Sequence, residues 1–222
     1  MVFVLAATVF LAGLPAAWVQ PAAAGDQADI RLPQPKPTGG MTLADALAKR
    51  RSHKAFGDGK LSIEQVSQIC WAAQGITEPD KGLRTAPSAM ALYSIRVFVV
   101  DDKALYEYVP KPHALRRLGT ERPLENLRAA QEKQAAIQSA PLCIVLTMDV
   151  GRLKPRCGPR AERYCLMESG HVAQNVLLQA TALGLVSVPV GGIDEAKVSE
   201  ALKLPAHLRP VYILPVGFAK PK

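Results

Sequence analysis

The chain has 222 residues, of which 49% are apolar, so it can bury a sizeable core and is not expected to be disordered. Aromatic residues make up only 5%, and no run of basic residues is interleaved with them, which excludes a typical nucleic-acid-binding surface. The formal charge of +8 instead favours an anionic ligand or an anionic surface as a partner.

The first 24 residues differ from the rest of the chain. Residues 1–19 carry no charged side chain, and Ala22, Ala23 and Ala24 form a small-residue cleavage pattern. We therefore expect residues 1–24 to be a signal peptide and the protein to be exported to the periplasm. Two alternatives stay open: the segment is an uncleaved anchor, or the start codon is misassigned and the protein is cytoplasmic. Roughly 14 apolar residues precede Pro15, fewer than the ~20 of a membrane span, so no stable span is expected after cleavage.

Residues 25–40 are rich in proline and lack periodicity, which predicts a linker or an extended arm. The domain itself is expected to cover residues 41–222, and it opens with two capped helices. Thr42 caps the first helix, and Ser62 with Gln65 forms a capping box for the second.

The middle and the end of the chain combine strands with helices. Segments rich in β-branched or alternating apolar residues predict strands at 93–100, 105–109, 142–148 and 211–216. Residues 124–139 predict one helix with many exposed charges, and residues 150–163 predict an irregular basic segment. Because these elements do not alternate as regular βαβ units, we expect an α+β fold with a mixed central sheet flanked by helices.

Residues 164–183 are apolar around most of the helical circumference, which predicts a buried helix with one narrow polar stripe. Gly184 ends this helix, and residues 186–188 predict a short strand. Asp194 is expected to cap a further helix at residues 195–202. Ordinary core packing accounts for this pattern without any binding function.

Three stretches could hold an anionic, planar ligand. Residues 50–54, RRSHK, offer three cations and a hydroxyl that can grip a phosphate. The turn at 84–89 and the glycine pair within 189–192 can present backbone groups to a flat ring. Each stretch alone can also be explained without a ligand. The three explanations are a solvated helix end, an ordinary turn and a common glycine pair.

The four cysteines predict no metal site, because no CxxC or His-rich spacing is present. Cys70 and Cys143 lie in apolar patterns and are expected to be buried thiols. Cys157 and Cys165 could pair in an oxidising compartment, or stay free.

Taken together, the stretches resemble one family. The matching segments are RRSHKAF at 50–56, ICWAAQGI at 69–76, RTAPSAMALYSIRVFVV at 84–100, LYEYVPKPHALRRL at 105–118, APLCIVL at 140–146, GPRAERYCLMESGHVAQNVLLQATALGLVSVPVGGID at 158–194 and PVYILPVG at 210–217. The chain resembles the FMN-dependent nitroreductase family over about residues 42–220, and within it the branch of the thiazole- and oxazole-forming peptide dehydrogenases.

The resemblance implies a domain-swapped type of homodimer that binds FMN at the subunit interface. Residues 50–54 match the motif that grips the phosphate, ribityl chain and pyrimidine edge, and residues 87–89 match a turn supplied by the second subunit. The paired glycines match backbone that approaches the flavin N5. The implied cofactor-binding residues are Arg50, Arg51, Ser52, Lys54, Pro87, Ser88, Ala89, Gly191, Gly192 and Lys220.

The expected activity is passage of hydride or electrons between a donor such as NAD(P)H and an organic acceptor, either a small molecule or a peptide. No individual catalytic side chain is predicted. The alternative is an exported FMN-binding or catalytically inactive protein of the same fold that acts as a binding or scaffold module. Glu168 is expected to pair with one of the arginines of the 158–163 segment, or else to be a pocket acid.

Overall fold

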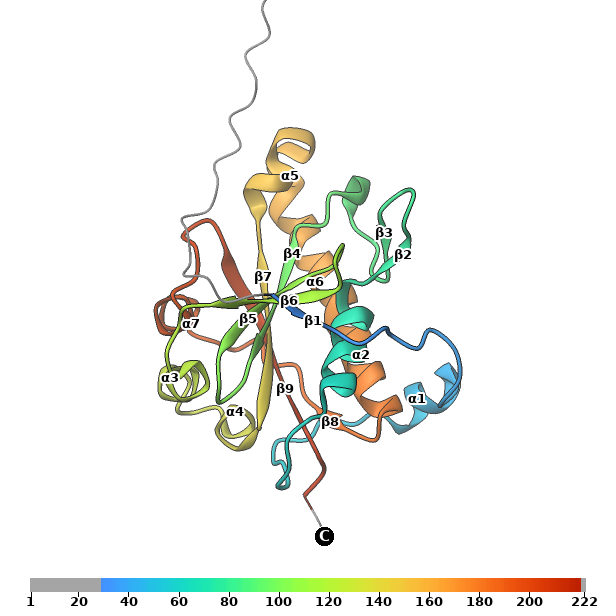
Figure 1. Ribbon diagram of the computed structural model, residues 1–222. Helices are drawn as coiled ribbons and strands as arrows, with labels where there is room; N and C mark the ends of the chain where they lie inside the picture. The colour runs from blue at the N-terminus through green and yellow to red at the C-terminus, as the bar shows by residue number, and fades with distance from the viewer. Residues whose placement is uncertain (1–28, 221–222) are drawn as a thin grey trace, which may run out of the picture.

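The computed structural model describes residues 29–220, so the predicted signal peptide at 1–24 lies outside the described residues. A seven-stranded sheet forms the centre, in the order β1-β6-β5-β4-β7-β9-β8, and β2 and β3 form a separate hairpin (Figure 1). The strands are β1 (Ile30–Arg31), β2 (Ile76–Glu78), β3 (Leu83–Arg84), β4 (Ile95–Val100), β5 (Leu105–Val109), β6 (Ala114–Leu118), β7 (Leu142–Met148), β8 (Val186–Ser187) and β9 (Arg209–Gly217).

Helices cover both faces of the sheet. The α-helices are α1 (Leu43–Lys49), α2 (Ile63–Gln74), α3 (Pro123–Ala130), α4 (Ala135–Ser139), α5 (Val150–Cys157), α6 (Ala161–Ala182) and α7 (Glu195–Leu202). Side chains of α2, α5 and α6 pack into one core against the sheet, and α3, α4 and α7 pack into a second core on the other face. Figure 1 shows these two helical layers on either side of the strands.

The sheet separates the two cores by strand alternation. On β4, Val97 and Val99 belong to the core with α2 and α6, whereas Phe98 and Val100 belong to the other. Every residue of β7 is buried, because helices cover both of its faces. The long helix α6 therefore lies against the middle of the sheet, as its nearly continuous apolar surface predicts.

The capping predictions agree with the structure. The Thr42 side chain accepts a hydrogen bond from the Asp45 backbone N–H at the start of α1. Ser62 and Gln65 form the complete capping box of α2, and the Asp194 side chain accepts from the Lys197 N–H at the start of α7. These interactions join residues three positions apart, so local sequence is enough to specify them.

The single helix predicted for residues 124–139 is wrong, because the structure divides it into α3 and α4. The break has a tertiary cause. The buried Gln131 amide donates to the Asp194 carbonyl and accepts from the Asp194 N–H, both at 3.3 Å. The Gln134 amide donates to the Gly192 carbonyl at 2.6 Å. The non-helical turn thus places two glutamine side chains on the loop that follows β8.

The irregular segment predicted for residues 150–163 is also wrong. Helix α5 occupies its first half, a 3₁₀ turn (Gly158–Arg160) follows, and α6 already begins at Ala161. Asp149 caps α5 by accepting from the Arg152 N–H at 3.0 Å. Leu153 and Cys157, four residues apart, bury one face of the helix, and this short apolar stripe outweighs the basic composition.

The α+β class is confirmed. All ladders between the named strands are antiparallel, and the predicted mixed character is limited to one parallel bridge between Ser52 and Ser187 within residues 29–220. The strands predicted at 93–100 and 105–109 are present as β4 and β5, which pair as an antiparallel hairpin with Phe98 opposite Glu107. In the described part of the chain, no helix combines the length and the apolar character needed to cross a membrane.

Candidate functional site

The segment that follows α1 runs along the edge of the sheet. Ser52 forms a parallel bridge with Ser187 of β8, and the His53 N–H donates to the Ser187 carbonyl at 3.2 Å. Two backbone contacts therefore hold the predicted 50–54 motif beside β8. Ser52 and Lys54 are exposed there, and Arg50 is half-buried.

The end of the chain lies beside the same segment. Phe56 bridges Ala219, and the Gly57 N–H donates to the Phe218 carbonyl at 3.0 Å. A Cβ on Gly57 would lie 2.8 Å from the Ala219 carbonyl oxygen and 3.3 Å from the Lys220 Cα, so this approach requires glycine. The structure thus brings Lys220 to the 50–54 motif, although about 166 positions separate Lys54 from Lys220 in the sequence.

The paired glycines lie further along the same edge. Val190 exchanges two backbone hydrogen bonds with Ile213, at 2.8 and 3.0 Å. Ser187 pairs with Val216, which lies three residues after Ile213 on β9. Val190 is therefore about 10 Å from Ser187 at ~3.3 Å per residue, and the two glycines follow Val190 directly. A Cβ on Gly191 would lie 3.1 Å from the Tyr212 ring, so any larger residue at this position would require the ring to shift.

Several donors of this edge have no acceptor in the described part of the chain. Within residues 29–220, neither the Gly191 N–H nor the Gly192 N–H makes a hydrogen bond, and both residues are exposed. Across the same described range, Arg50, Lys54 and Lys220 form no ion pair. Cations and free backbone donors along one exposed edge fit a ligand that carries a phosphate and a polar ring edge.

Arg51 is arranged differently from its neighbours. Its Nη1 donates to the Ala48 carbonyl at 2.9 Å and to the Arg50 carbonyl at 2.7 Å. The guanidinium therefore caps the end of α1 and still leaves other N–H groups exposed. In this geometry Arg51 both closes the helix and adds positive charge to the edge.

The turn at Pro87–Ala89 does not join this edge within one chain. Ser88 Oγ donates to Glu168 at 2.7 Å, in the first half of α6, whereas Ser52 lies beyond the other end of that helix. Glu168 and Ala182 are 14 positions apart, about 21 Å along the axis at ~1.5 Å per residue. A single chain therefore places seven of the ten predicted residues along one edge and the other three apart.

The separated turn has an unusual backbone. Met90, Ala91 and Tyr93 have φ values of 55°, 54° and 50°, in the left-handed region that non-glycine residues rarely adopt. The Ser88 hydroxyl accepts from the Tyr93 N–H at 2.8 Å and so closes the turn. Backbone strain of this kind persists where surrounding contacts hold it and often marks functional segments.

Glu168 supplies those contacts, and its predicted pairing with an arginine is wrong. This buried carboxylate accepts five hydrogen bonds, from two hydroxyls, two backbone N–H groups and one amide. The donors are Ser88 Oγ, Ser94 Oγ, the Ser94 and Ile95 N–H groups and Gln74 Nε2. Neutral donors satisfy the carboxylate without a salt bridge. Glu168 therefore fixes the strained turn and the start of β4 to α6.

The cysteines offer no disulfide to the site. All four are buried free thiols, so Cys157 and Cys165 are not joined. Burial raises the pKa of the Cys143 thiol to about 12, and burial likewise raises the pKa of the Cys70 thiol. Both groups are therefore protonated and unreactive at neutral pH.

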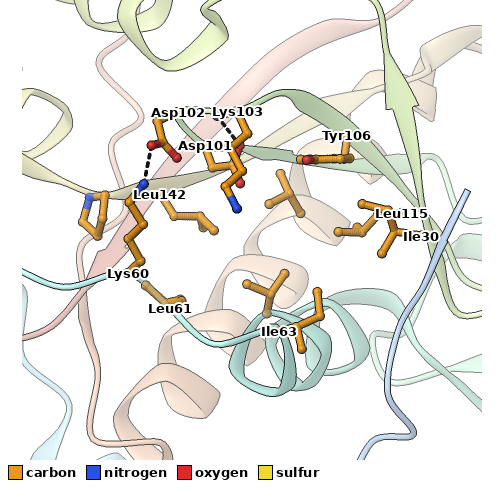
Figure 2. Close-up of a pocket in the computed structure, with 13 residues that line it drawn as sticks. Ile30, Lys60, Leu61, Ile63, Asp101, Asp102, Lys103, Tyr106, Leu115 and Leu142 are labelled. Atoms are coloured by element: carbon orange, nitrogen blue, oxygen red, sulfur yellow. Dashed lines mark hydrogen bonds and ion pairs between the residues drawn. The ribbon is translucent and has the colours of Figure 1, made fainter. Parts of the chain in front are cut away.

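A cavity of about 250 Å³ lies at the turn of the β4–β5 hairpin, between α2 and the sheet (Figure 2). Figure 2 shows Lys60 and Asp102 joined at one side of it, with Ile63 and Leu115 lining its interior. None of the ten predicted site residues lines this cavity. Its wall is largely apolar, and its two lysines, Lys60 and Lys103, are balanced by Asp101 and Asp102, so the lining carries no excess of positive charge for a phosphate.

The antiparallel α+β fold and its cationic, donor-rich edge define a domain suited to an anionic planar ligand. The sequence profile of the nitroreductase family matches residues 47–218. The chain therefore belongs to the nitroreductase family, which makes it an oxidoreductase of the flavin type.

Individual relatives support this assignment. A protein of Methanocaldococcus jannaschii described as a nitroreductase is 36% identical over 199 residues, which cover 87% of this chain and 98% of that protein. A crystal structure of a Ralstonia eutropha protein, also described as a nitroreductase, is similar with a TM-score of 0.80 and 27% identity, covering 91% of this chain and 94% of that one.

A more distant solved structure has the same fold. A chain of the E. coli microcin synthetase complex, solved with a truncated pro-microcin bound, matches with a TM-score of 0.69 over 89% of this chain and 80% of that one. At an identity of 20%, this structural match shows a shared fold alone.

Proposed function

We propose that the protein is an FMN-dependent oxidoreductase that passes hydride or electrons between a donor such as NAD(P)H and an organic acceptor. The observation that carries the proposal is the sheet edge along which both cations and glycine N–H groups lie. Within residues 29–220, Arg50, Lys54 and Lys220 make no ion pair and the N–H groups of Gly191 and Gly192 have no acceptor. FMN, when bound, supplies the redox chemistry, and the protein supplies binding, orientation and electrostatics.

Each part of the edge has a role in this proposal. Arg50 and Arg51 carry guanidinium groups that bind a phosphate through paired N–H donors, and the Ser52 hydroxyl adds a neutral donor. Lys54 places a positive charge that stabilises negative charge on the pyrimidine side of a flavin. The Gly191 and Gly192 N–H groups would donate to polar atoms of the ring, and Lys220 would add a cation for the phosphate.

We further propose a homodimer, because the Pro87–Ala89 turn lies about 21 Å along α6 from the edge and can complete the site only from a second copy. Exposed apolar side chains on α1 and α6 provide a surface for that copy. They are Leu43, Leu47, Leu166 and Met167. Light scattering after size exclusion should give twice the chain mass, and a monomer that binds FMN fully would contradict this arrangement.

The test of function begins with the absorbance spectrum of the purified protein with added FMN, followed by anaerobic titration with NADPH. We expect a visible flavin band that NADPH bleaches. Lys54→Ala should weaken FMN binding about tenfold or more, because a charge-assisted contact is lost. Lys49→Ala, on the last turn of α1, removes another exposed lysine and is the matched control.

Two results would redirect the proposal. Unchanged FMN affinity in Lys54→Ala would show that the edge is not the flavin site. FMN binding that depends on Lys54 without reduction by NADH or NADPH would favour the alternative of a binding or scaffold module.

We also propose export to the periplasm, on the basis of the uncharged apolar segment at residues 1–19 and the alanines that follow it. Fractionation of cells that express the full-length chain, with mass spectrometry of its N-terminus, tests this. A cytoplasmic protein that retains residues 1–24 would contradict it.

A further inference from the structure

A second cavity, of about 260 Å³, lies where β4 begins and β5 ends, next to α5. Five cationic side chains from separate segments line it, together with one carboxylate. They are Arg84, Arg96, Lys111, Arg116 and Arg152, and the carboxylate is Glu107. Such an excess of positive charge around one cavity is unfavourable unless an anion enters it.

The only carboxylate of this lining is already engaged. Glu107 pairs with Arg96, and its other oxygen lies 3.8 Å from Arg116. Arg116 also lies 3.9 Å from Asp29. Among residues 29–220, Arg84, Lys111 and Arg152 have no carboxylate partner. Three cations of the lining are therefore available to a ligand.

Arg84 is the residue most in need of an acceptor. Its guanidinium stacks on the Tyr93 ring, with Cζ 4.3 Å from the ring centroid, and Nη1 donates to Gln74 Oε1 at a long 3.4 Å. Its Nε is buried and has no hydrogen-bond partner within the described chain. A buried N–H without an acceptor is costly and is rare in folded proteins.

The arginines of the cavity also influence one another. Burial lowers the pKa of Arg84, and the nearby Arg152 charge contributes to the same lowering. The pKa of Arg96 is lowered by burial first and by Arg152 next. Arg152 is itself held over the cavity, since its Nε donates to the Leu92 carbonyl. The positive charges of three elements thus converge at this position.

We propose that this cavity binds the carboxylate or phosphate group of a small organic molecule, with Arg84 and Arg152 as its main ligands. The two guanidinium groups offer paired N–H donors that match either oxyanion. Tyr93, Tyr108 and Ile95 provide an apolar wall for the rest of the molecule. None of its lining residues belongs to the sheet-edge segments 50–57, 186–192 or 218–220. The cavity does adjoin the Pro87–Ala89 turn, because Arg84 precedes that turn and the Tyr93 N–H donates to Ser88 Oγ.

Isothermal titration of the purified protein with inorganic phosphate and with succinate, at constant ionic strength set by chloride, tests the proposal. We expect saturable binding of at least one probe, and the stronger probe identifies the preferred oxyanion. Arg84→Gln and Arg152→Gln should each weaken binding about tenfold, because each removes a charge-assisted contact. Arg117→Gln, an exposed arginine on β6 outside the cavity, should bind like the unaltered protein.

Phosphate can also reach the Arg50–Lys54 edge, so Lys54→Ala is titrated in parallel. The proposal predicts that oxyanion binding survives in Lys54→Ala and is lost in Arg84→Gln. Circular dichroism melting establishes that each variant is folded, and FMN titration of Arg84→Gln separates a failure of this site from a failure of the flavin proposal. Absence of saturable binding, or equal binding by Arg84→Gln, Arg152→Gln and Arg117→Gln, would overturn the inference.

Discussion

The first half of α6 and the sheet edge beyond its end differ in how their polar groups are satisfied. Near the start of α6, the buried Glu168 accepts five hydrogen bonds, so the carboxylate and the groups that donate to it all have partners. At the edge, the Gly191 and Gly192 N–H groups and Lys54 have no protein partner within residues 29–220. Buried polar groups with complete partners stabilise the fold, whereas exposed donors without partners are free to hold a ligand.

The largest effect is expected at Glu168. Glu168→Ala leaves the buried Ser94 and Ile95 N–H groups without an acceptor, so we expect the free energy of unfolding to fall by about 3–5 kcal/mol. Urea denaturation measures this loss. Glu162→Ala is the control, because Glu162 is exposed on the same helix and its ion pair with Arg209 is worth less than about 1 kcal/mol. Equal losses of unfolding free energy in Glu168→Ala and Glu162→Ala would show that the hydrogen bonds of Glu168 stabilise the fold no more than an exposed ion pair does.

An intermediate effect is expected at the edge. Gly191→Val introduces a Cβ 3.1 Å from the Tyr212 ring and methyl groups beside a free N–H, so stability should fall by about 1–3 kcal/mol. FMN affinity should fall at least about tenfold in the folded variant, since the ligand loses access to a donor. Fluorescence titration measures the affinity. Gly119→Val, in a position with open space around its Cβ, should retain it. Unchanged FMN affinity in Gly191→Val would show that the glycine pair is not part of the flavin site.

The smallest effect is expected at His113, a half-buried side chain outside the two regions compared above. Its Nε2 lies 2.8 Å from Ser67 Oγ and 3.1 Å from the Pro33 carbonyl. Because the Ser67 hydroxyl donates to that same carbonyl at 2.6 Å, Nε2 carries a proton, and Nδ1 accepts from the Tyr108 hydroxyl at 2.9 Å. Burial lowers the pKa of His113 below its ordinary value of 6.5, and the Pro33 contact partly offsets this.

Because the unfolded chain then binds a proton more readily than the folded one, the His113 contribution to stability is complete above pH 6.5. It declines as the pH falls from 6.5 towards the lower folded-state pKa. Urea unfolding across this interval should show the decline in the unaltered protein and a flatter profile in His113→Asn, in which asparagine tolerates the positive φ of 47° at this position. Parallel profiles would exclude His113 as the source.

Local elements were the most predictable part of the fold. The caps at Thr42, Ser62 and Asp194 agree with the structure because each depends on residues three positions away. The segments at 124–139 and 150–163 were mispredicted for the opposite reason. Gln131 turns out of a helix to bind the distant Asp194 backbone, and α5 is stabilised by burial of Leu153 and Cys157. Neither contact can be deduced from its own segment.

The candidate site shows the same division. Family resemblance selected residues 50–54 and the glycine pair, and the structure places them about 10 Å apart along one edge. The cations of the second cavity form no motif, because they come from positions spread between 84 and 152 and meet only where β4, β5 and α5 converge. The glutamines that hold the glycine loop were missed likewise, since their partners lie about 60 positions away.

The amino-acid sequence by itself determined the α+β class, the capped helices, the buried strand β7 and the grouping of cations at residues 50–54, because periodicity, caps and charge are local properties. Only the tertiary structure decided which groups meet. It placed Lys220 beside the 50–54 motif, satisfied Glu168 with neutral donors and gathered unpaired arginines at one cavity. Contacts between distant segments depend on how the two helical layers pack on the sheet, and that packing is a property of the whole chain.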